Sequence, residues 1–143
     1  MAAIEVRGDQ WPLLLVSWNA VQTDEDIERY IADSNGYLQR REPFVLLTYM
    51  RRYHNEARHR ARLAAWMKET SELARKYCVA SVMVADSMAF RFALSTLLLL
   101  ASLPFPYKVC ASEIDAEVFL REEAAKRGLR LPARLSFPSA RAT

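Results

Sequence analysis

Runs of apolar residues alternate with amphipathic stretches along the whole chain. A weak alternation over residues 3–7, followed by Gly8 and Asp9, predicts an edge strand and a turn that leads into a hairpin. Continuous β-prone runs, such as FVLLTYM at 44–50, are typical of strands that are covered on both faces. The runs that predict buried strands are 12–18, 44–50 and 79–85, with a shorter last strand at 107–111.

The segments between these strands carry helix signals. Thr23 stands before three consecutive acidic residues, and Ser112 stands before Glu113, as expected at helix starts. Gly128 is suited to end the last helix. The predicted helices span about 23–41, 55–77, 88–103 and 112–127.

Strands that alternate with helices predict an α/β domain with right-handed crossovers. We expect a mostly parallel sheet of four to five strands, an N-terminal antiparallel edge strand and about four helices. A chain of 143 residues, 52% hydrophobic and 26% charged, forms one such domain, which we place at residues 1–128. Residues 129–143 contain three arginines, two prolines and no acid, and are predicted to form a flexible basic tail.

Two cysteines are too few for a disulfide scaffold, and no signal-peptide pattern opens the chain. We therefore expect a cytoplasmic protein. The spacing of Leu129, Leu131, Leu135 and Phe137 leaves open that the tail adds a strand to the sheet of a neighbour.

The second half of the chain resembles the STAS family, the bacterial anti-sigma-factor antagonists and their distant lipid-carrier-like relatives. The resemblance rests on the order of the elements, the strand and turn at 79–87, Arg91 in an apolar helix, the Pro104-Phe105-Pro106 break and residues 112–120. It implies a regulatory or scaffolding module that binds proteins and catalyses nothing. Signalling members carry a phosphorylatable Ser or Thr after the third strand, but residues 49–55 contain neither. The resemblance therefore implies no phosphorylation switch at that position.

Residues 51–62 (RRYHNEARHRAR) are strongly basic, with Glu56 as the single acid. They follow a predicted parallel strand, at the sheet end where α/β folds bind ligands. One interpretation is a solvated face that pairs with the acids of residues 24–28, and another is a patch for an acidic protein partner. Nucleic acid is disfavoured because Tyr53 is the one interleaved aromatic residue. The candidate partner-binding residues are Arg51, Arg52, His54, Arg58, His59 and Arg62.

The helix predicted at 88–103 is apolar on more than one face. It is shorter than the roughly 20 residues of a membrane span, and Arg91 interrupts it. We therefore expect the leucines that one buried helix face cannot accommodate to pack against another surface. A homo-oligomer interface is favoured over deeper packing in the monomer or contact with lipid. The candidate interface residues are Phe90, Leu94, Leu97, Leu98 and Leu100.

Catalytic patterns are missing from the sequence. Ser87 lies in no nucleophile elbow, no glycine-rich phosphate loop occurs, and His54 and His59 are spaced by five, which suits no metal site. We expect no enzyme, no cofactor and no metal. The leading hypothesis is a STAS-like module that acts by self-association and protein binding. The alternative is a lipid or anionic-ligand binding domain at a membrane surface, with an acyl chain against 88–103 and its head near Arg58 or Arg62.

Overall fold

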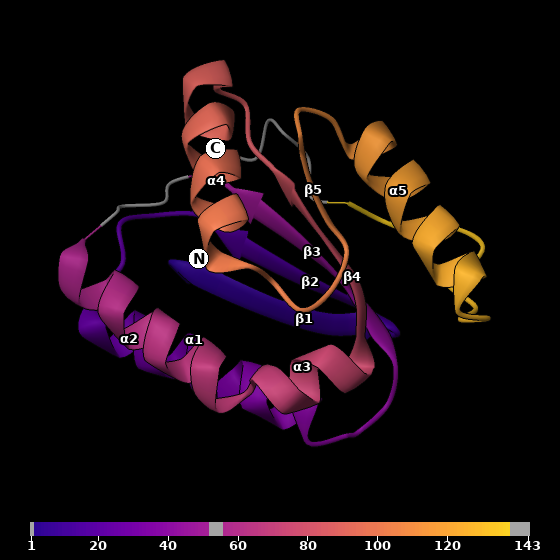
Figure 1. Ribbon diagram of the computed structural model, residues 1–143, viewed down its shortest axis with the longest axis horizontal. Helices are drawn as coiled ribbons and strands as arrows, with labels where there is room; N and C mark the ends of the chain where they lie inside the picture. The colour runs from indigo at the N-terminus through magenta and orange to yellow at the C-terminus, as the bar shows by residue number, and fades with distance from the viewer. Residues whose placement is uncertain (1, 52–55, 138–143) are drawn as a thin grey trace.

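The chain folds around a single five-stranded sheet (Figure 1). The computed structural model describes residues 2–51 and 56–137. The strands lie in sequence order; β1 is antiparallel to β2, and each later strand is parallel to the one before it. The elements are β1 (Ile4–Gln10), β2 (Leu13–Trp18), α1 (Asp24–Leu38), β3 (Phe44–Met50), α2 (Ala57–Glu69), α3 (Ser71–Tyr77), β4 (Cys78–Val84), α4 (Met88–Ala101), β5 (Tyr107–Cys110) and α5 (Glu113–Lys126).

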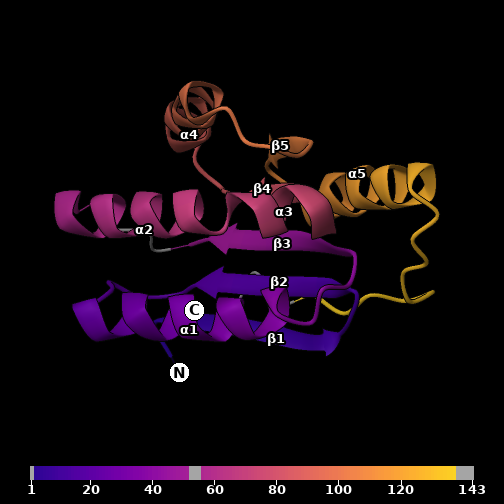
Figure 2. The same cartoon turned by 60° about the horizontal axis from the view of Figure 1, so that its bottom comes forward.

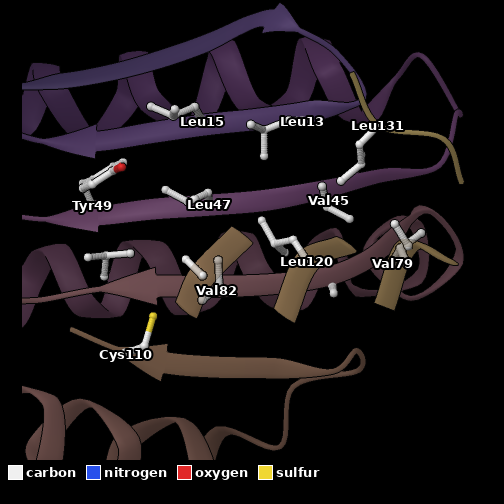
Figure 3. Close-up of a cluster of buried hydrophobic side chains, with 14 residues drawn as sticks. Leu13, Leu15, Val45, Leu47, Tyr49, Val79, Val82, Cys110, Leu120 and Leu131 are labelled. Atoms are coloured by element: carbon white, nitrogen blue, oxygen red, sulfur yellow. The ribbon is translucent and has the colours of Figure 1, made fainter. Parts of the chain in front are cut away.

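The two faces of the sheet are covered differently. On the face that we call the closed face, α5 packs directly on the central strands, and its Leu120 lies over Val82 and Leu47 (Figure 3). All three side chains are fully buried. On the opposite face, which we call the open face, lie α1, α2, α3 and α4 (Figure 2).

The predicted helix boundaries are set by side-chain caps. The Thr23 hydroxyl accepts a bond from the Asp26 amide (3.2 Å), and the Asp26 carboxylate accepts one from the Thr23 amide (2.8 Å). This reciprocal pair is a complete capping box. The Ser112 hydroxyl caps α5 by accepting a bond from the Asp115 amide (3.1 Å), and Gly128 follows that helix with a positive φ of 67°.

Two local predictions need correction. β1 continues through Gly8 and Asp9 to Gln10 and the strand-to-strand turn lies at Trp11 and Pro12, although the Trp11 amide donates to the Gly8 carbonyl (3.1 Å) and so closes a tight turn that begins at Gly8. A Cβ at Gly8 would overlap the Tyr37 ring, so close approach explains the glycine. The helix predicted at 55–77 divides at Thr70 into α2 and α3, so the described residues form five helices instead of about four. The Thr70 hydroxyl donates to the Trp66 carbonyl (2.9 Å), a back-bond that is common where helices bend.

The segment that follows α5 contacts the domain. Leu131 is buried in the core of the closed face, and the Arg121 guanidinium donates to the Pro132 carbonyl (2.9 Å). The Gln10 side chain donates to the carbonyl of Ser136 (2.7 Å). Residues 129–137 thus extend the folded domain, which differs from the predicted tail outside it. Residues 138–143 lie outside the described part of the chain.

Candidate functional site

An apolar groove lies over the open face. The principal packing partners of α2 are α1 and α3, whereas α4 lies beside the β5 edge, so the helices leave the central strands partly uncovered (Figures 1 and 2). The result is a cavity of about 390 Å³. Its floor comes from β2, β3 and β4, and its walls from α1, α2, α3, α4 and the 103–105 turn. The volume is in the range of small-molecule sites.

The burial of the central strands shows the same asymmetry. Leu47 and Val82 on the closed face are completely buried, as expected for the middle of a covered sheet. Leu46 and Met83, which lie next to them along the strands but point to the open face, are only half-buried. Both line the groove. Part of the open face of the sheet is therefore exposed in the groove, whereas the same strands are covered on the closed face.

The groove contains little charge. Among the described residues that line it, Arg60 is the one charged side chain, and it extends from the beginning of α2. Burial raises the pKa of Tyr30 to about 12 and that of the Cys78 thiol to about 12, so both groups are neutral at physiological pH. The remaining polar lining consists of hydroxyls from Ser34, Thr48, Thr70, Ser71 and Ser81.

Helix α4 presents an apolar outer face. Leu94 and Leu98 are its buried residues, and Arg91 turns back to donate to the carbonyls of Ala85 (2.6 Å) and Asp86 (2.7 Å). Four large apolar side chains point outward: Met88 (77% exposed), Phe92 (76%), Leu99 (72%) and Leu100 (78%). We call these four residues the α4 surface.

The predicted interface residues divide between the inside and the outside of the fold. Leu94 and Leu98 belong to the protein's own core, which corrects their assignment to an interface, and Phe90 is half-buried against that core. Leu97 and Leu100 are exposed as predicted. Met88, Phe92 and Leu99 are also exposed, although they were not among the candidate interface residues. Their spacing of four and seven places them on one helical stripe, a signal that the consecutive leucines of 97–100 obscured.

The predicted basic patch is largely engaged within the chain. His59 is buried between α1 and α2 with its Nε2 atom 2.8 Å from Asp24, which corrects its place on an exposed patch. Arg62 forms two bonds to Glu28 (2.8 and 3.1 Å), and Arg58 lies 3.0 Å from Asp24.

The Arg51 guanidinium covers the Tyr49 ring at 5.2 Å, and Arg52 and His54 lie outside the described residues. The observed pairs match the first interpretation of this segment, a basic face that pairs with the acids of α1.

Ser87 and the two cysteines all make local hydrogen bonds to the backbone. Ser87 caps α4 by accepting a bond from the Phe90 amide (3.2 Å). Burial raises the pKa of both cysteine thiols, so neither is an activated nucleophile. Within residues 2–51 and 56–137, no group of three or more His, Cys, Asp or Glu residues could hold a metal ion. In the same residues, no helix combines the length and apolarity that crossing a bilayer requires.

Comparison with known proteins adds no relative: no family model, no curated protein and no solved structure matches the chain. The sheet order, with an antiparallel first strand and parallel strands after it, is the α/β arrangement that the STAS resemblance implies. Membership of that family stays a prediction.

Proposed function

We propose that this protein is a STAS-like module of the cytoplasm that catalyses no reaction and acts by self-association and protein binding. The α4 surface is the proposed contact. The observation that carries the proposal is that α4 is apolar except for Arg91, Ser95 and Thr96, although the fold buries only two of its residues. A helix of this composition is normally enclosed by protein or lipid.

The arrangement of the α4 surface supports a contact with another protein. Single exposed apolar side chains are ordinary, whereas contiguous apolar patches mark interaction sites. Met88, Phe92 and Leu99 form one stripe with the exposed Ser95 and Thr96 between Phe92 and Leu99, and Leu100 lies to one side of it. Arg91, the one charge on the helix, is directed to the loop before it. A second copy of the same surface is the simplest complementary partner, because two-fold contacts pair a patch with itself.

A contact between opposite charges of two copies is not part of the proposal. It would bring the basic residues 51–62 of one copy against the acids of residues 24–28 of another. Asp24 and Glu28 are instead paired with His59, Arg58 and Arg62 of their own chain. An intermolecular contact would have to replace these pairs. We therefore assign self-association to the apolar surface alone.

The test is the concentration dependence of the mass of the purified protein. Sedimentation velocity between about 1 and 100 µM should show a reversible monomer–dimer equilibrium, because an interface of moderate size gives dissociation constants in the micromolar range. A protein that stays monomeric throughout this range contradicts self-association.

A further inference from the structure

We propose that the groove of the open face binds a single-chain anionic amphiphile of the long-chain carboxylate class, with its chain along the sheet and its carboxylate at Arg60. This site is separate from the α4 surface, which lies on the outward side of α4. The inference therefore goes beyond the proposed self-association. Three observations carry it: the length of the groove, its apolar lining and the position of its single charge.

The groove is long enough for an aliphatic chain. Its lining includes both Phe44 and Met50, the first and last residues of β3. Seven residues of parallel strand extend over about 20 Å. Cys78 and Phe105 lie at the end near Phe44. This end is apolar and suits the terminal part of a chain.

The groove wall favours hydrocarbon over a polar ligand. Leucine, methionine, aromatic and alanine side chains predominate, and the polar groups are hydroxyls distributed along the length. Leu46 and Met83 on the floor are half-buried, so a chain lying on them would remove apolar surface from water. A sugar or nucleotide would leave many of its polar groups without partners in such a site.

The charge is at the end where a head group would emerge. Arg60 follows the carboxyl end of β3, the end at which open α/β sheets bind their ligands. No acidic side chain is found among the described lining residues, and Tyr30 and Cys78 are neutral. A guanidinium can hold a carboxylate through two parallel hydrogen bonds. The neighbouring cations Arg58 and Arg62, near which the sequence analysis placed a head group, contact acids of α1 and do not line the groove.

The first experiment tests the position of the site. Binding of palmitate is measured by displacement of a fluorescent long-chain carboxylate from wild type, Ala64→Trp and Ala61→Trp. Both alanines are exposed on α2, but only Ala64 lines the groove, so both variants should fold and only Ala64→Trp should obstruct the chain. We expect saturable 1:1 binding that Ala64→Trp weakens at least tenfold and Ala61→Trp leaves within about twofold. Equal binding by the two variants, or no binding by wild type, overturns the proposed site.

The second experiment tests the charge. Arg60→Gln should weaken palmitate binding about tenfold and leave binding of the uncharged alcohol hexadecanol unchanged, because a charge-assisted bond is lost only for the carboxylate. Arg58→Gln is the matched control, since Arg58 is also an exposed arginine on α2 but does not line the groove. If Arg60→Gln weakens both ligands equally, or neither, the anionic part of the proposal is wrong. Thermal unfolding of each variant should coincide with wild type.

Discussion

Substitution of Phe92 by aspartate tests the α4 surface most directly. Phe92 is 76% exposed in the single chain, and complete burial of such a side chain contributes about 1.5–3 kcal/mol. Its burial at an interface is therefore worth about 1–2 kcal/mol. In a two-fold dimer the substitution occurs twice, so the loss doubles to about 2–4 kcal/mol. Phe92→Asp should raise the dimer dissociation constant by about 30- to 1,000-fold.

Sedimentation velocity over a concentration series measures this change. Val21→Asp is the control, because Val21 is 62% exposed but lies between β2 and α1, away from α4. It should leave the dissociation constant within about threefold of wild type, since surface substitutions away from an interface have small effects. Both variants should unfold at the temperature of wild type, because neither side chain is in the core. If Phe92→Asp associates as wild type does, the α4 surface is not the contact.

The remaining predictions concern the fold itself. Leu120→Ala removes a fully buried side chain between α5 and the sheet and should lower the free energy of unfolding in urea by about 2–5 kcal/mol; a loss below about 1 kcal/mol would contradict the packing of the closed face. Thr23→Ala removes half of a capping box and should lower the same free energy by about 1 kcal/mol, with no change in the palmitate affinity. Because burial raises the pKa of Cys78 from 9.0 to about 12, iodoacetamide at pH 8 should leave Cys78 unmodified in the native protein and label it after unfolding in urea, as peptide mass spectrometry would show. The same shift predicts that the free energy of unfolding falls as the pH rises above 9, since the unfolded thiol loses its proton while the native thiol keeps it; an increase above pH 9, absent in Cys78→Ala, would contradict the shift.

Much of the architecture follows from local sequence signals. The runs at 44–50 and 79–85 become β3 and β4 within one residue, because their residues can be buried on both faces only in the middle of a sheet. Thr23 and Ser112 mark their helices because a side-chain cap acts within four residues of the chain. The break at Thr70 was not predicted, since the apolar spacing of the two helices on either side of it is continuous.

The candidate sites were predicted less well, and the leucines of α4 show why. Four consecutive leucines at 97–100 have no periodicity, so the sequence contains the excess of apolar side chains without indicating which of them face outward. The contact of α4 with the β5 edge determines that Leu98 is buried while Leu99 and Leu100 are exposed. That contact is made by side chains that are distant along the chain. The spacing of apolar residues within α4 therefore could not predict it.

The arginines of α2 divide in the same way. Their spacing alone separates Arg60 from Arg58 and Arg62 around the helix, because residues four apart share a face and residues two apart do not. The amino-acid order thus determines the strands, the caps and which basic side chains point together. The packing of α2 on α1 determines the surroundings of these side chains. Arg58 and Arg62 contact acids of α1, and Arg60 lines the apolar groove. The reason is that a groove is a space between elements, and its volume exists only after those elements are placed against one another.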